Sequence, residues 1–286
     1  MTDSLNVAVI GAGTMGNGIA QTFATFGHTV TLIEVAQDGL DRGLAAVRKS
    51  LDRFVKKEKM TQEETDAIFG RITGSLDMEG AVANVDMVIE AVFENEQVKK
   101  DIFKVLDKAA PAGCILASNT SSISITSIAS VTSRPESVVG MHFMNPVPLM
   151  KLVELIKGEK TSDEVVAKTK AIAESVGKTV GVSEDYAGFV ANRILMPMLN
   201  EAAFTLYEGI ATRDDIDTIM KLGMNHPMGP LALADFIGID VCVNILDYLY
   251  EQFGDPKFRC APNMRRMVQA GKLGRKSGEG FYDYSK

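Results

Sequence analysis

The sequence has few of the residues that build disulfide frameworks, metal centres or membrane spans. Only 3 of its 286 residues are cysteines. An odd, widely spaced set of this kind indicates free thiols in a reducing compartment, and its spacing does not match a metal-ligand motif, so no metal is expected. No apolar run reaches membrane-spanning length and no signal peptide opens the chain, which predicts a cytoplasmic protein without a membrane partner.

Positive charge is also sparse and scattered. Lysine and arginine total 30 against 37 acidic residues, giving a formal charge of −7. Because the basic residues are dispersed along the sequence, the composition argues against nucleic acid as the main partner. Histidines number 3, which leaves few candidates for a catalytic imidazole. The apolar fraction of 46% is ordinary for a globular chain of two domains with substantial cores.

Strand and helix patterns alternate over the first two thirds of the chain and then only helices follow. This alternation predicts an α/β fold, with a mostly parallel sheet domain over 1–184 and an all-helical domain over 185–286. The first helix of the second domain is expected over 187–207, with a kink at Pro197. Strands are predicted at 5–10, 28–35, 85–92, 114–117, 138–141, 151–156 and 178–182.

A glycine-rich turn joins the first predicted strand to a helix. Its glycines, Gly11, Gly13 and Gly16, permit the tight turn, the approach of a pyrophosphate and the close packing of helix on strand. Glu34 ends the next strand, where a carboxylate binds the adenine ribose of NAD and repels the 2′-phosphate of NADP. Strand, glycines, helix, strand and acid together predict a Rossmann-like domain that binds NAD through Gly11, Gly13, Thr14, Met15, Gly16 and Glu34.

Three polar residues stand out in the apolar stretch 138–154, namely His142, Asn145 and Glu154. Pro146 and Pro148 force a bend between two strand-like segments, which can bring the ends of the interval 142–154 together. A carboxylate bonded to one imidazole nitrogen would fix the tautomer and prepare the other nitrogen as a general base. The alternative is a core histidine and a structural glutamate at a strand edge.

Small polar residues follow the predicted strand 114–117. The segment Ser118-Asn-Thr-Ser-Ser122 lies at a carboxyl strand end, where ligands bind in open α/β sheets and a hydroxyl can bond a substrate oxygen. The alternative is that Ser121 or Ser122 caps the helix that includes 125–129.

A charged helical pair predicted at 38–59 and 61–69 is longer than a crossover needs. The simpler interpretation of its basic face is a solvated surface. The more specific one is a site for an anionic, phosphate-bearing substrate. This face carries Arg48, Lys49, Ser50, Lys56 and Lys57.

Taken together, the motifs resemble those of the short-chain L-3-hydroxyacyl-CoA dehydrogenases, particularly the bacterial 3-hydroxybutyryl-CoA dehydrogenases, over essentially the whole chain. The matching segments are Gly11-Ala-Gly-Thr-Met-Gly16, Ser118-Asn-Thr-Ser-Ser122, His142-Phe-Met-Asn-Pro-Val-Pro, Met150-Lys-Leu-Val-Glu154, Gly188-Phe-Val-Ala-Asn-Arg193, His226-Pro-Met-Gly-Pro230 and Gly274-Arg-Lys-Ser-Gly-Glu-Gly-Phe-Tyr282.

This resemblance implies roles for individual residues. His142 would be the general base and Glu154 its partner, while Ser121 and Asn192 would hold the substrate oxygen. Asn145 would order cofactor and substrate. The cofactor would also be contacted by Ser121 and, on its nicotinamide side, by Glu94, Lys99 and Lys276. Coenzyme A would be contacted by Ser50 and Lys57.

The expected activity is interconversion of acetoacetyl-CoA and 3-hydroxybutyryl-CoA with NAD, by a homodimer or larger assembly built through the helical half. An alternative on the same fold is a dehydrogenase of a free hydroxy acid or sugar acid, which would not need the basic helical pair. A second alternative is a nucleotide-binding protein that has lost catalysis.

Overall fold

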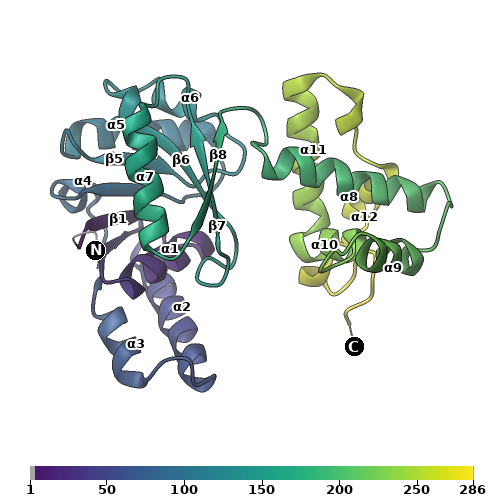
Figure 1. Cartoon of the computed structure of the whole chain (residues 1–286), viewed down its shortest axis with the longest axis horizontal. Helices are drawn as coiled ribbons and strands as arrows, with labels where there is room; N and C mark the ends of the chain where they lie inside the picture. Colours follow the sequence, from purple (N-terminus) through teal and green to yellow (C-terminus); the bar gives the residue numbers. More distant parts are fainter. Residues whose placement is uncertain (1–3, 286) are drawn as a thin grey trace. The chain divides into compact units, whose positions relative to one another are not determined.

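The computed structural model describes residues 4–285. The chain divides into two compact units, of which the first ends at Tyr186 and the second begins at Ala187. The sequence placed this division after residue 184. Figure 1 draws both units, and each is described below by itself.

The first unit contains one sheet of eight strands in the order β3-β2-β1-β4-β5-β6-β7-β8. Neighbouring strands are parallel except β6 and β7, which are antiparallel, so β7 and β8 run opposite to the other six. This is the mostly parallel α/β sheet that the sequence predicts. The strands are β1 Asn6–Ile10, β2 Thr29–Ile33, β3 Ile72–Ser75, β4 Met87–Glu90, β5 Ile115–Ser118, β6 Val138–Phe143, β7 Leu152–Lys157 and β8 Thr179–Glu184.

Helices cover both faces of this sheet because its central strands are apolar on both sides (Figure 1). Val139 and Met141 of β6 join the core that contains α1, α2 and α7. Gly140 points the other way, toward Ile125 of α6. The helices are α1 Thr14–Thr25, α2 Gln37–Lys56, α3 Gln62–Phe69, α4 Met78–Val82, α5 Glu96–Ala109, α6 Ile125–Ala129 and α7 Asp163–Ser175, with a 3₁₀ turn η1 at Pro135–Ser137.

The second unit is helical, as the sequence predicts. α8 begins at Ala191 and runs through Pro197. Two buried carboxylates fasten the unit's last segment, since Asp217 accepts from the hydroxyl of Tyr282 and Asp235 from the backbone of Phe281. The helices are α8 Ala191–Tyr207, α9 Arg213–Gly223, α10 Pro230–Ile237, α11 Ile239–Phe253 and α12 Pro262–Gln269, with 3₁₀ turns η2 Pro256–Phe258 and η3 Arg275–Ser277. Within residues 4–285, every helix is too short or too polar to cross a membrane.

Candidate active site

The candidate site lies where the six co-directional strands end. In open α/β sheets this carboxyl edge is where ligands bind. The loops that follow β1, β4, β5 and β6 all emerge at this edge. Because β7 runs the other way, its first residues lie at the same edge as the last residues of β6.

His142 and Glu154 face each other across β6 and β7. They are direct partners in the antiparallel register, and His142 Nδ1 lies 3.2 Å from Glu154 Oε2. Both residues are buried, at 7% and 5% exposure. A buried imidazole held by a carboxylate at Nδ1 has its ring orientation fixed, which suits proton transfer through the other nitrogen. The structure thus brings together the pair that the proline-containing turn suggested.

Asn145 lies in the loop between these two strands and is exposed. The loop spans residues 144–151 and contains a cis Asn145–Pro146 peptide bond. It is folded back on itself, because the backbone N–H groups of Leu149 and Met150 both donate to the carbonyl of Pro146, each at 3.0 Å. Asn145 therefore sits three residues beyond His142 on a defined turn.

Ser121 lies on a turn that Glu94 holds in place. The Glu94 carboxylate accepts from the Thr120 hydroxyl (2.6 Å), from Ser121 N–H (2.9 Å), and from both N–H and hydroxyl of Ser122. Burial acts to raise the pKa of the Glu94 carboxyl. The charge of Lys99 and these hydrogen bonds outweigh burial and hold the pKa below its ordinary value.

The alternative that Ser121 or Ser122 caps α6 is wrong. The N-cap of α6 is Ser124, whose hydroxyl accepts from Ser127 N–H. Its geometry is completed by Asp185, which accepts from the Ser124 hydroxyl and from Ile125 N–H. Capping is thus performed farther along the chain than the sequence suggested.

Lys99 is buried in the core rather than displayed toward a ligand. Its ammonium lies 2.6 Å from Glu90 Oε1 and 3.4 Å from Glu94 Oε2, and its side chain is 1% exposed. Glu90 is fully buried and also accepts from the Ser118 hydroxyl at 2.6 Å. Lys99 therefore bridges the core carboxylate of Glu90 to the carboxylate that holds the Ser121 turn.

The glycine-rich turn has the geometry of a dinucleotide cradle. Gly11 has φ +97°, and a Cβ there would lie 2.7 Å from the carbonyl oxygen of Ala91. A Cβ on Gly16 would collide with the carbonyl of Gly11, so close packing requires glycine at 16. At Gly13, which precedes α1, a Cβ would meet no protein atom within 4 Å. This open approach to the first N–H groups of α1, at Thr14 and Met15, fits a pyrophosphate.

An apolar cavity of about 340 Å³ continues from this turn, lined by residues from four separate segments. Glu34 stands at its edge, where its carboxylate accepts from Ala12 N–H (3.0 Å) and Val35 N–H (2.8 Å). The size and lining fit a nucleoside. The sequence alone did not identify the apolar wall, which comprises Ile10, Ile33, Val35, Leu76, Met78, Ala91, Val92, Phe93, Val98 and Ile102.

Ser50 and Lys57 lie on and just after the last turns of α2. Lys57 is the exposed C-cap residue, and Ser50 is half-buried. Arg48, part of the same basic face, is already engaged, since it pairs with Asp66 at 2.5 Å and stacks over the ring of Phe69. Lys57 therefore differs from Arg48 in that the positive charge of Arg48 is already neutralised by Asp66 of α3.

Two expected site residues belong to the second unit. Asn192 is buried in the first turn of α8, where its N–H donates to the carbonyl of Gly188. Lys276 lies in η3, and its ammonium donates to Asp240 at 2.7 Å. The remaining expected residues all lie in the first unit.

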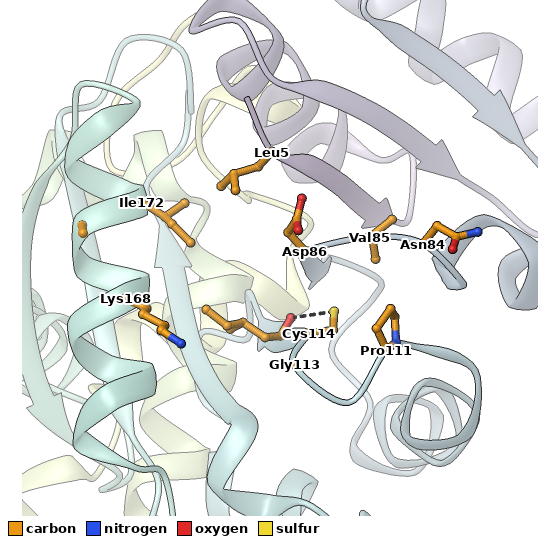
Figure 2. Close-up of a pocket in the computed structure, with 11 residues that line it drawn as sticks. Leu5, Asn84, Val85, Asp86, Pro111, Gly113, Cys114, Lys168 and Ile172 are labelled. Atoms are coloured by element: carbon orange, nitrogen blue, oxygen red, sulfur yellow. Dashed lines mark hydrogen bonds between the residues drawn. The ribbon is translucent and has the colours of Figure 1, made fainter. Parts of the chain in front are cut away.

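A larger cavity of about 590 Å³ lies at the opposite, amino-terminal edge of the sheet, between β5 and α7 (Figure 2). It contains none of the expected site residues. Cys114 lines it, but its thiol bonds the carbonyl of Ile115 and burial raises its pKa to about 11. A thiol of this kind is not a nucleophile at neutral pH.

Comparisons with known proteins place the chain in one family. Residues 6–186 match the 3-hydroxyacyl-CoA dehydrogenase NAD binding domain, and residues 188–284 match the 3-hydroxyacyl-CoA dehydrogenase C-terminal domain. The chain is 49% identical over 278 residues to a 3-hydroxybutyryl-CoA dehydrogenase of Bradyrhizobium diazoefficiens, covering 97% of this chain and 94% of the relative.

More distant and structural relatives agree. A mitochondrial hydroxyacyl-coenzyme A dehydrogenase of Sus scrofa is 42% identical, with 98% of this chain and 91% of the relative covered. The crystal structure of the (S)-3-hydroxybutyryl-CoA dehydrogenase PaaH1 from Ralstonia eutropha matches with a TM-score of 0.94 and 50% identity, covering 99% of this chain and all of that one. The chain therefore belongs to the 3-hydroxyacyl-CoA dehydrogenase family.

Proposed function

We propose that this protein is an NAD-dependent (S)-3-hydroxyacyl-CoA dehydrogenase that interconverts acetoacetyl-CoA and 3-hydroxybutyryl-CoA. The observation that carries the proposal is the buried His142–Glu154 pair at the carboxyl edge of the sheet. Relatives named for this activity, at about half sequence identity, support the choice of substrate.

His142 exchanges the proton of the reaction. In oxidation its neutral imidazole takes the proton of the 3-hydroxyl group as the bond between oxygen and hydrogen breaks. In reduction its imidazolium returns that proton to the developing alkoxide. Because Nδ1 faces Glu154, we assign the transfer to Nε2. NAD, when bound, supplies the hydride chemistry. A positioned acid or base of this kind contributes about 10²–10⁴-fold to the rate.

Ser121 and Asn192 hold the substrate oxygen, and Asn145 orders cofactor and substrate. The Ser121 turn is already fixed by Glu94, so its hydroxyl needs little reorganisation to reach a ligand. Lys276 contributes from the second unit on the nicotinamide side. Lys99, whose ammonium is buried against Glu90 and Glu94, contributes through the Glu94 carboxylate rather than by its own contact.

The glycine-rich turn and the adjoining apolar cavity would hold NAD. The N–H groups of the first turn of α1, beside Gly13, would bind its pyrophosphate, and the apolar cavity would accept its adenine. The Glu34 carboxylate would bond the ribose hydroxyls and repel a 2′-phosphate, so NAD would be preferred over NADP.

Coenzyme A extends over the basic face of α2. Lys57 pairs with a phosphate and Ser50 donates a hydrogen bond. This anionic portion of the substrate separates the proposal from a dehydrogenase of free hydroxy acids or sugar acids, which has no use for these contacts.

The second unit forms the interface of a homodimer or larger assembly in the cytoplasm. It exposes large apolar side chains on and around α9, including Ile219 (57%), Leu222 (80%) and Met224 (60%). An apolar cavity of about 420 Å³ lies beside them between α8 and α9. An apolar surface of this extent on a small helical unit favours burial against a second copy.

The test is oxidation of NADH followed at its absorbance, with acetoacetyl-CoA or free acetoacetate as the acceptor. We expect kcat/KM with acetoacetyl-CoA to exceed that with the free acid by at least about 100-fold, and the His142→Ala variant to lose most of it. A preference for the free acid would favour the hydroxy-acid alternative. NADH binding without turnover of any acyl-CoA tested would support loss of catalysis.

A further inference from the structure

The segment just before β8 contains a buried cation that holds the loop between β6 and β7. Lys178 is 8% exposed, and its ammonium donates to the backbone carbonyls of Val147 (2.6 Å) and Met150 (2.9 Å). Within residues 4–285, no carboxylate forms an ion pair with this ammonium. Its charge is therefore balanced only by the dipoles of the loop that it holds.

Such an arrangement is expensive unless the hydrogen bonds are made. Removing an ammonium from water costs several kcal/mol. Burying backbone carbonyls without hydrogen-bond donors adds a further free-energy cost. Burial accordingly lowers the pKa of the Lys178 ammonium. Lysine and loop thus depend on each other. Val147 and Met150 gain a donor that no strand partner supplies, and Lys178 gains acceptors.

The same loop is held on its other side by the cofactor-binding helix. Val147 is 2% exposed, and a Cβ on Gly18 of α1 would lie 3.0 Å from its side chain. Val147 is therefore held from two directions, because its side chain packs against α1 and its carbonyl accepts from Lys178. The first residue of β8 also holds the end of the loop, because Thr179 N–H donates to the carbonyl of Lys151 at 2.7 Å.

This loop connects the residues that the proposed reaction needs. It starts after His142, contains Asn145 and leads into β7, which carries Glu154. A shift of the loop would move Asn145 directly, while the strand pairing of β6 with β7 holds the register of His142 and Glu154. Displacements near 1 Å in an active site can lower rates by about 100-fold.

We propose that Lys178 is a positioning residue that sets the place of Asn145 by clamping the loop 144–151 against α1. This inference rests on the proposed function, in which Asn145 orders cofactor and substrate. Lys178 acts through the loop, because its ammonium is buried against the carbonyls of Val147 and Met150.

The first test is the Lys178→Met variant, which keeps the apolar stem and removes the donor. Lys151→Met is the matched control, because Lys151 is an exposed lysine of the same loop. We expect Lys178→Met to lower kcat/KM for acetoacetyl-CoA by about 10- to 100-fold and Lys151→Met to change it less than about threefold. An unchanged Lys178→Met, or equal losses in both variants, would overturn the proposal.

The second test asks whether the effect passes through Asn145. In an Asn145→Ala background, Lys178→Met should lower kcat/KM by less than about threefold, because the group it positions is gone. A full loss in that background would show that Lys178 acts independently of Asn145 and would reject the proposal.

The third test does not depend on activity. Amide hydrogen exchange of the segment 144–151 should quicken by at least about tenfold in Lys178→Met, with no change in the central strand β4. If the variant does not fold, Lys178→Gln, which retains an N–H donor on a shorter stem, should show a smaller increase in the same segment. Parental exchange in the variant that folds would refute the clamp, whereas a parent protein inactive on acetoacetyl-CoA would refute only the proposed function.

Discussion

Glu154 stands directly opposite His142 in the antiparallel pairing of β6 and β7, with Oε2 placed 3.2 Å from Nδ1. Both side chains are almost withdrawn from solvent. A carboxylate in this position orients the ring and stabilises the charge that the ring acquires during proton transfer. Removing either side chain should therefore lower the rate of the chemical step.

We expect Glu154→Gln to lower kcat by about 10- to 100-fold and His142→Ala by about 10²–10⁴-fold, with cofactor binding retained. Because the two residues act as a unit, the double variant should fall little below His142→Ala alone. Steady-state kinetics of all three variants check this. Losses that multiply in the double variant would mean that Glu154 acts independently of His142.

Glu34 should decide the choice of cofactor. Its carboxylate is held at the edge of the apolar cavity by Ala12 N–H and Val35 N–H, where a 2′-phosphate would meet it. We expect kcat/KM with NADH to exceed that with NADPH by at least about tenfold, a difference of about 1.4 kcal/mol. Glu34→Gln should narrow this ratio, and a parental preference for NADPH would contradict the assignment.

Lys57→Ala should weaken binding of acetoacetyl-CoA and leave NADH unaffected. An exposed ion pair is worth about 0.2–1 kcal/mol, so the KM for acetoacetyl-CoA should rise by no more than about fivefold. The effect should shrink as salt is added. Lys108→Ala, an exposed lysine on α5, is the control. Equal changes in both KM values, or none, would reject Lys57 as a contact.

The second unit should hold the assembly together. Sedimentation at micromolar concentration should give a mass at least twice the 30.9 kDa of one chain. Leu222→Glu, at a side chain 80% exposed in the single chain, should shift the protein toward monomer. Lys160→Glu, on the first unit, should not. A monomeric parent protein would contradict the interface.

We expect the folded protein to lose stability as the pH falls, because of the buried histidine His28, which lies just before β2. Leu5 N–H donates to His28 Nδ1, so that nitrogen must stay unprotonated, and burial lowers the pKa of His28 from 6.5. The unfolded chain therefore binds more protons just below pH 6.5. The stabilisation is complete above that pH and is lost as the pH falls through the lowered pKa.

Urea denaturation of the parent and of His28→Gln at pH 7.5 and 5.5 tests this. We expect the parent to lose more free energy of unfolding between the two pH values than the variant does. His226→Gln, at a half-buried histidine of the second unit, should behave like the parent. Equal losses in the parent and His28→Gln would rule out the role of His28.

Most of the strands, such as β1, β4, β5 and β6, could be predicted because their apolar runs are buried, but β3 could not. Only Ile72 of its four residues is buried, and Gly74 adds no strand preference, so this strand has no alternating pattern. It forms because β2 offers it a free edge. The short α4, five residues long, likewise owes its position to tertiary contacts more than to sequence pattern.

In the site, a contact between residues close to one another in sequence was predicted, whereas contacts between side chains and backbone of distant segments were not. The interval from His142 to Glu154 is a single hairpin, so a bend was enough to suggest the pair. The buried position of Lys99 and the part of Glu90 could not be foreseen, because charged side chains are rarely buried. The role of Lys178 could not be predicted either, because it is also a buried charge and because its acceptors are backbone carbonyls about thirty residues away.

Because β6 and β7 are antiparallel neighbours, the length of the loop between them decides which side chain of β7 faces His142. Side chains alternate along a strand, so removing or adding one residue between 144 and 151 would slide β7 by one position and turn Glu154 to the opposite face. Val153 or Leu155 would then face His142. A change of two residues would restore the face but displace the carboxylate by about 7 Å along the strand. The length of the loop 144–151 therefore fixes which side chain of β7 stands opposite His142.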